Sequence, residues 1–160
     1  KISLNTKNVI RMRTFSKAYG MAGLRVGYAI GEKELILNFE KIRNHFGMSR
    51  VSQVGALAAL EDNEFICKVV NKVALTRSRI ADIATRNNCK FIPSFTNFVA
   101  IDCLNDSKFA KRVLDNLINK GVFVRMPYSF PQNRCIRVTV GLDKDIDLFE
   151  KYFPIAIKES

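Results

Sequence analysis

The apolar positions in the middle of the chain recur every three or four residues, which is the period of an α-helix. They predict a helix over about residues 32–44, and a second that starts from a cap at Ser49 or Ser52 and ends at Asp62. The second helix contains many alanines, and we expect it to be tightly packed and buried. A third helix, over about residues 63–87, would extend roughly 36 Å. That length is enough to connect two lobes of a protein.

On either side of these helices the pattern changes to short alternating runs with β-branched residues, which are typical of strands. Two amphipathic helices, over residues 107–120 and 143–157, separate and follow the later runs. Strands are predicted at residues 8–12, 24–30, 90–92, 98–102, 122–125 and 135–140. The order of elements predicts an α/β protein whose last part is a small sheet backed by helices.

The chain has 160 residues, of which 48% are hydrophobic and 26% charged, as in ordinary globular proteins. We find neither an apolar run long enough to span a membrane nor a secretory signal at the start, and expect a cytoplasmic protein without a membrane partner. The first residue is Lys1 and not methionine, so we expect the chain to be a piece of a longer protein.

The four cysteines, Cys67, Cys89, Cys103 and Cys135, are widely spaced, and there is only one histidine. This spacing argues against a metal site, and the mostly apolar neighbours of the cysteines predict buried free thiols in a reducing compartment.

The net charge is +11. Its cations are mostly scattered and are not interleaved with aromatic residues, so no nucleic-acid partner is expected. We expect an acidic segment elsewhere in the protein to balance much of this charge.

The stretch from Arg13 to Tyr28 reads RTFSKAYGMAGLRVGY and carries the candidate chemistry. A lysine in a pocket of low dielectric constant loses its proton more easily, and the neutral amine forms a Schiff base with an aldehyde. Hydroxyl groups and a guanidinium together suit a phosphate group. Arg25 falls within a predicted strand that should be half-buried, where its charge would need an anion. An aldehyde and a phosphate on one small molecule describe pyridoxal phosphate.

The same stretch resembles the lysine motif of the class I and II aminotransferases of fold type I, and is most similar to the histidinol-phosphate aminotransferase branch. Later segments resemble the family in the same order, including Pro93–Val99, Gly121–Arg125 and Ile136–Gly141. The resemblance implies that the chain is the C-terminal part of a fold-type I enzyme. Residues 1–62 would be the trailing part of the large cofactor domain, 63–90 a linking helix, and 91–160 the small α+β domain.

The resemblance also implies roles for particular residues. Lys17 would be catalytic and would link to pyridoxal phosphate, whose phosphate group Thr14, Ser16 and Arg25 would hold. The substrate anion would be bound by Arg137, Arg125 and Asn97.

The implied reaction transfers an amino group from a small-molecule donor to a 2-oxo acid in amino-acid biosynthesis. The donor would be histidinol phosphate or an aromatic amino acid, and the enzyme a homodimer. Family residues that contact the pyridine ring lie upstream of the lysine motif, so we expect this chain alone to be weak or inactive. A decarboxylase or lyase of the same fold, similar to threonine-phosphate decarboxylase, and a non-catalytic basic binding module remain alternatives.

Overall fold

The computed structural model describes residues 6–160. The chain forms two compact units, Lys1–Val70 and Asn71–Ser160, which are described separately below. The long helix α3, Asn63–Arg86, contains the boundary between them. The prediction of this helix over residues 63–87 is confirmed, and the division of the chain into three parts stays a prediction.

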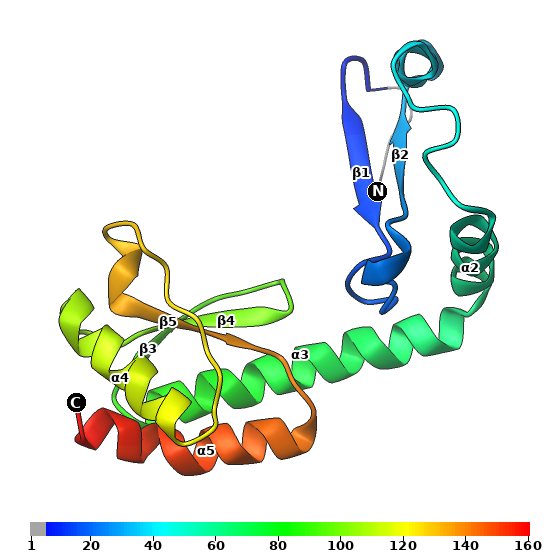
Figure 1. Cartoon of the computed structure of the whole chain (residues 1–160). Helices are drawn as coiled ribbons and strands as arrows, with labels where there is room; N and C mark the ends of the chain where they lie inside the picture. The colour runs from blue at the N-terminus through cyan, green and yellow to red at the C-terminus, as the bar shows by residue number, and fades with distance from the viewer. Residues whose placement is uncertain (1–5) are drawn as a thin grey trace. The chain divides into compact units, whose positions relative to one another are not determined.

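The N-terminal unit is built on an antiparallel pair of strands, β1 (Ile10–Thr14) and β2 (Gly27–Gly31), as Figure 1 shows. Helix α1 (Lys33–Leu37) follows, and a 3₁₀ turn continues it to Lys41. The predicted helix over residues 32–44 is therefore too long. Ile42, the last position of the predicted apolar stripe, is 82% exposed, so the end of the predicted helix lacks the packing on which helices depend for most of their stability.

Helix α2 (Arg50–Glu61) begins at the predicted cap, where the Ser49 hydroxyl oxygen accepts a hydrogen bond of 3.0 Å from the Ser52 amide. The prediction that α2 is buried is wrong in the described structure. Val54 is 70% exposed and Leu57 60% exposed, and Ser52 is the one buried residue of this helix. Alanine has the highest helix propensity whether or not it is buried, so the alanines predict the helix but not its environment.

The C-terminal unit contains a three-stranded antiparallel sheet in the order β3–β4–β5 (Figure 1). The strands are β3 (Lys90–Ile92), β4 (Phe98–Asp102) and β5 (Cys135–Thr139). Helices α4 (Ser107–Asn119) and α5 (Asp143–Lys158) complete the unit. The predicted strand at residues 122–125 is wrong, because this segment joins the sheet only through a single bridge between Arg125 and Arg137.

The core of this unit lies between one face of the sheet and the helices. Alternate residues of β4 and β5 point into it, and the buried turns of α3, α4 and α5 cover them. On the surface, Arg79 of α3 donates hydrogen bonds to Asp147 and Glu150 of α5. Hydrogen bonds from Arg86 and Arg79 hold the pKa of the Glu150 carboxyl below its ordinary value. The side chains that form the core include Ile80, Ile83, Val99, Ile101, Val113, Leu117, Ile136, Val138, Phe149 and Phe153.

Three of the four cysteines are buried, and all four are free thiols. Cys67 is exposed, so the prediction of burial is wrong for this residue. It lies on the N-terminal half of α3, where no residue is buried, because the buried residues of that helix begin at Thr76. No helix in the described residues is long and apolar enough to cross a membrane.

Asp106 caps α4, since its carboxylate accepts a hydrogen bond of 2.7 Å from the Phe109 amide. We expect Asp106→Ala to lower the free energy of unfolding by about 1 kcal/mol, because an amide at the start of the helix loses its partner. Urea denaturation followed by circular dichroism would measure this. Asp115→Ala on the same helix removes the same charge but only an exposed ion pair with Lys111, and should cost about 0.4 kcal/mol. Equal losses in both variants would contradict the capping role.

Candidate functional site

Phe15 anchors the segment that connects β1 to β2. Its side chain is 2% exposed, and its ring lies 4.8 Å from that of Tyr19 and 5.8 Å from that of Tyr28. Its amide donates to the Val26 carbonyl, and its own carbonyl accepts from the Met21 amide. The residues on either side of Phe15 are therefore held by both packing and main-chain hydrogen bonds.

Two glycines allow close main-chain and helix contacts around this segment. A Cβ atom on Gly27 would lie 2.6 Å from the Arg13 carbonyl oxygen, which is too close for any side chain. A Cβ atom on Gly55 of α2 would lie 3.2 Å from side-chain atoms of Leu24 and Met21. Helix α2 is thus able to pack closely against the segment.

Three of the predicted cofactor residues come together at this segment. The Thr14 hydroxyl oxygen accepts a hydrogen bond of 3.0 Å from the Ser16 amide. The Arg25 guanidinium lies 3.5 Å from the Ser16 hydroxyl oxygen and donates a hydrogen bond of 2.7 Å to the Ala22 carbonyl. Two hydroxyl groups and a guanidinium therefore form one cluster, which we call the hydroxyl–arginine cluster. No carboxylate is paired with Arg25 in the described part of the chain.

Arg25 does not lie in a half-buried strand, so that prediction is wrong. It is exposed and ends the 3₁₀ turn Ala22–Leu24, with a left-handed backbone of φ 49° and ψ 48°. The turn takes up the start of the predicted strand, and β2 begins only at Gly27. A left-handed residue other than glycine costs about 1–2 kcal/mol, so the surrounding hydrogen bonds must hold Arg25 in place.

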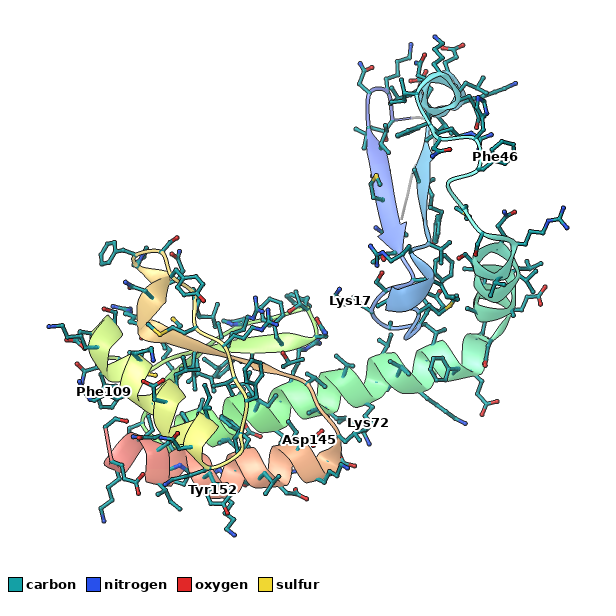
Figure 2. All side chains as sticks on the ribbon, viewed as in Figure 1. Lys17, Phe46, Lys72, Phe109, Asp145 and Tyr152 are labelled. Carbon is teal, nitrogen blue, oxygen red and sulfur yellow. The ribbon has the colours of Figure 1, made fainter. Side chains whose placement is uncertain are left out.

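Lys17 lies on the same segment, directly after Ser16, and Figure 2 labels it there. Its carbonyl oxygen accepts a hydrogen bond of 2.8 Å from the Gly20 amide. Its side chain is exposed, so the expected pocket of low dielectric constant is not formed by the described residues. The neighbouring Ala18 and Gly20 are too small to cover the amine. Lys17 is therefore next to the hydroxyl–arginine cluster in the sequence, but its side chain makes no hydrogen bond to the members of the cluster.

Sequence reasoning missed the contribution of α2 to this site. The Ser52 hydroxyl donates a hydrogen bond of 2.7 Å to the Leu24 carbonyl, one residue before Arg25. Ser52 and Gly55 are three residues apart and therefore share one face of the helix. Two small residues at this spacing, among larger apolar ones, were the signal for a close helix contact. Their effect is to fix the turn from which Arg25 projects.

A second group of predicted site residues lies in the C-terminal unit. Arg125 and Arg137 sit directly opposite each other, joined by main-chain hydrogen bonds of 3.1 and 2.6 Å. The Arg137 Nε is buried, without a hydrogen-bond partner in the described residues. Its guanidinium lies 4.9 Å from the centre of the Phe98 ring. Like charges directly opposite each other are unfavourable, so the pair is suited to an anion.

The two arginines line a groove of about 1020 Å³. Helix α4 adds further cations to it, including Lys108 and Arg112. Asn97 is not among the residues that line this groove. It lies just before β4, where its carbonyl accepts a hydrogen bond of 2.9 Å from the Val140 amide. The structure therefore brings Arg125 and Arg137 together, but no contact joins the Asn97 side chain to either of them.

Comparison with known proteins gives the family. The family model for aminotransferase class I and II matches residues 3–148. The chain belongs to the class I and II aminotransferases. Among curated members of this family, it is 39% identical over 134 residues to histidinol-phosphate aminotransferase of Aliarcobacter butzleri. It is 41% identical over 134 residues to the enzyme of that name from Bacillus velezensis. Each match covers 84% of this chain but 36% of the relative.

Solved structures of aminotransferases share the fold. The histidinol-phosphate aminotransferase of Sinorhizobium meliloti, in complex with pyridoxal-5'-phosphate, matches with a TM-score of 0.90 and 44% identity. That match covers 98% of this chain and 43% of the chain of the Sinorhizobium meliloti enzyme. The L-threonine-O-3-phosphate decarboxylase of Porphyromonas gingivalis matches with a TM-score of 0.77 but only 18% identity, which shows the fold alone. The predicted fold, the C-terminal part of a fold-type I aminotransferase, is confirmed.

Proposed function

We propose that the whole protein is a pyridoxal-phosphate-dependent aminotransferase of the histidinol-phosphate type. The names of the most similar relatives support this, and so does the cofactor in the Sinorhizobium meliloti structure. The observation that carries the proposal is the hydroxyl–arginine cluster beside Lys17. The chain spans 36–43% of the length of these relatives, so the activity proposed is that of the whole protein.

The donor groups of the cluster fit the cofactor. A phosphate group needs hydrogen-bond donors and positive charge, and Thr14, Ser16 and Arg25 supply both from one short segment. Lys17 supplies the amine that would hold the cofactor, and the same nitrogen would carry the proton that is moved at the substrate carbon. The bound cofactor would act as the electron sink for the carbanion.

The arginine pair in the C-terminal unit is proposed to bind the substrate. Arg137 and Arg125 face each other, and no carboxylate of the described residues pairs with either of them. Asn97 directly precedes β4 of the same sheet and would be a further substrate residue. A carboxylate or phosphate on the amino donor, or the carboxylate of the 2-oxo acid acceptor, would neutralise the pair. We place the reaction in amino-acid biosynthesis in the cytoplasm, and propose a homodimer by analogy with the family.

The role of Arg25 can be tested with a variant that does not strain the backbone. Arg25→Gly removes the guanidinium, while glycine adopts the left-handed conformation at no steric cost. We expect the affinity for pyridoxal phosphate to fall about 10-fold to 100-fold, because a charged hydrogen bond is worth about 1.5–3 kcal/mol. The affinity for pyridoxal, which lacks the phosphate group, should not change. Absorbance titration would measure both affinities.

The control for this experiment is Arg13→Ala. Arg13 lies on β1 and carries the same charge, but among residues 6–160 its guanidinium donates only to the Met12 carbonyl. Its loss should leave the affinity for pyridoxal phosphate within about 2-fold of the original, since exposed charges act weakly at a distance. An equal loss in both variants, or an equal loss of pyridoxal binding, would contradict a phosphate-binding role for Arg25.

The substrate role predicts a second effect. We expect Arg137→Gln to weaken binding of histidinol phosphate by about 10-fold, because the substrate anion loses a charged hydrogen-bond donor whose Nε has no other partner in the described residues. Arg86→Gln is the matched control, since it removes the same charge from the same unit, and Arg86 pairs with Glu150 on the surface and does not line the groove. Chemical-shift titration by NMR would follow binding to both variants. Equal affinities for the two variants would exclude Arg137 from the substrate site.

A decarboxylase or lyase with the same cofactor is the second candidate. The fold is compatible with it, but the relatives from Aliarcobacter butzleri and Bacillus velezensis bear the aminotransferase name. The two reactions are separated by their products. Transfer of the amino group to 2-oxoglutarate would support the aminotransferase, whereas release of carbon dioxide from an amino acid phosphate would support the decarboxylase.

A further inference from the structure

Cys89 and Cys103 face each other across two neighbouring strands. Strands β3 and β4 pair Lys90 with Asp102 and Phe91 with Ile101. The same antiparallel register, continued by one residue, pairs Cys89 with Cys103. Residues directly opposite in such a pair point to the same face of the sheet, and both thiols belong to the core of the C-terminal unit.

Main-chain hydrogen bonds show which kind of cross-strand pair this is. The Cys89 amide donates to the Ala84 carbonyl at 3.0 Å, and the Cys103 amide donates to the Arg134 carbonyl at 3.3 Å. The two cysteines therefore do not exchange amide hydrogen bonds with each other. In such a non-hydrogen-bonded pair the Cα atoms are about 4.5 Å apart, which lies within the range of about 4.4–6.8 Å found for disulfides.

The two thiols are not equivalent. A hydrogen bond from the Cys103 thiol, working against burial, lowers the pKa of Cys89. The same contact, together with burial, raises the pKa of Cys103. The negative charge of Asp102 opposes ionisation of both. Cys89 is therefore the thiol of the pair that ionises first. It directly precedes β3, the edge strand of the sheet, whose three residues are exposed.

We propose that Cys89 and Cys103 form a site of reversible oxidation, in which a peroxide converts the dithiol to an intramolecular disulfide. The Cys89 thiolate attacks one peroxide oxygen, the O–O bond breaks, and Cys89 becomes a sulfenic acid; the leaving hydroxide takes up the proton that the thiol released and becomes water. The Cys103 sulfur then attacks the Cys89 sulfur, and the S–O bond breaks with loss of a second water. Two thiols are oxidised by two electrons, and one peroxide is reduced to two waters.

The disulfide would close the segment between the two cysteines into a loop. This segment contains β3, β4 and the connection between them, in which Asn97 lies. A covalent link at its base limits the separation of the two strands. Oxidation would therefore stiffen the connection that carries a proposed substrate residue, and reduction would release it. This consequence rests on the proposed function, whereas formation of the disulfide does not.

The other cysteines are not placed to compete for this link. Cys135 pairs in register with Asp102, the neighbour of Cys103, and alternation along the strand turns it toward the other face of the sheet. Cys67 is exposed on α3 and is the thiol expected to link separate molecules. Cys67→Ser and Cys135→Ser therefore serve as controls.

The test uses the reduced chain treated with hydrogen peroxide, alkylated, digested and analysed by mass spectrometry. The expected product is a peptide pair joined through Cys89 and Cys103, about 2 Da lighter than the two thiol peptides together, and separated again by dithiothreitol. Cys67→Ser and Cys135→Ser should give the same pair, and Cys103→Ser should give none. Hydrogen exchange of the amides of residues 94–97 should become slower on oxidation.

The outcome that overturns the proposal needs no variant. If Cys89 and Cys103 of the unaltered chain remain free thiols, and are therefore alkylated, at peroxide concentrations that oxidise Cys67, they are not a redox pair. The same conclusion follows if Cys89 proceeds to sulfinic acid without a link to Cys103. Loss of pyridoxal phosphate binding would test the function of the lysine segment separately and would leave this result unchanged.

Discussion

Sodium borohydride is expected to fix pyridoxal phosphate to Lys17, and Lys17→Ala is expected to lose this label completely. Borohydride reduces a Schiff base to a stable amine, so it marks the lysine that holds the aldehyde. Lys17 directly follows Ser16, a member of the hydroxyl–arginine cluster. This cluster is proposed to bind the phosphate group of pyridoxal phosphate. A cofactor held by its phosphate raises the effective concentration of its aldehyde at the nearest amine. Peptide mapping by mass spectrometry would locate the label.

The exposure of Lys17 makes the control important, because exposed lysines also react with aldehydes. Lys33 is exposed in the same unit, at the start of α1. It follows the end of β2 at which Gly31 pairs with Ile10, whereas the cluster lies at the opposite end, where Gly27 pairs with Thr14. Lys33→Ala should leave the label on Lys17 unchanged when the cofactor and the chain are mixed in equal amounts. A label spread evenly over several lysines, or one that persists in Lys17→Ala at the level of the unaltered chain, would contradict the catalytic role.

The elements that the sequence predicted well are those with strong local signals. Helix α3 carries a long amphipathic stripe and ends where predicted, and the hydroxyl of Ser49 caps α2 as expected. The error at residues 122–125 has another origin. Strand composition favoured a ladder, but a strand also needs a neighbour along its whole length, and only the bridge between Arg125 and Arg137 forms.

The site was predictable where its residues lie in one short sequence motif, and not where it depends on the tertiary structure. The grouping of Thr14, Ser16 and Arg25 was predicted from a recognised motif, and hydrogen bonds join the three residues in the structure, while their role in binding the cofactor stays a prediction. The environment of Arg25 did not follow, because a left-handed residue interrupts a sequence with strand composition. The contact from Ser52 to the Leu24 carbonyl joins residues 28 positions apart and depends on tertiary packing.

Phe153→Ala is expected to lower the free energy of unfolding of the C-terminal unit by about 3–5 kcal/mol. The Phe153 side chain is fully buried, and its ring stacks on that of Phe149 at 4.9 Å between centres. Truncation removes the buried ring and leaves a cavity that neighbours such as Ile80 cannot fill without moving. Domains have total stabilities of about 5–15 kcal/mol, so this loss is a large fraction of what holds the unit folded.

Phe95→Ala provides the matched comparison, because Phe95 belongs to the same unit but is 95% exposed. Its loss should change the free energy of unfolding by less than about 0.5 kcal/mol. The chain contains no tryptophan, so urea denaturation is best followed by far-UV circular dichroism. A loss below about 1 kcal/mol for Phe153→Ala would mean that the core around α5 is loosely packed. The sheet that presents Arg137 would then need support from outside this unit, since the same core backs both.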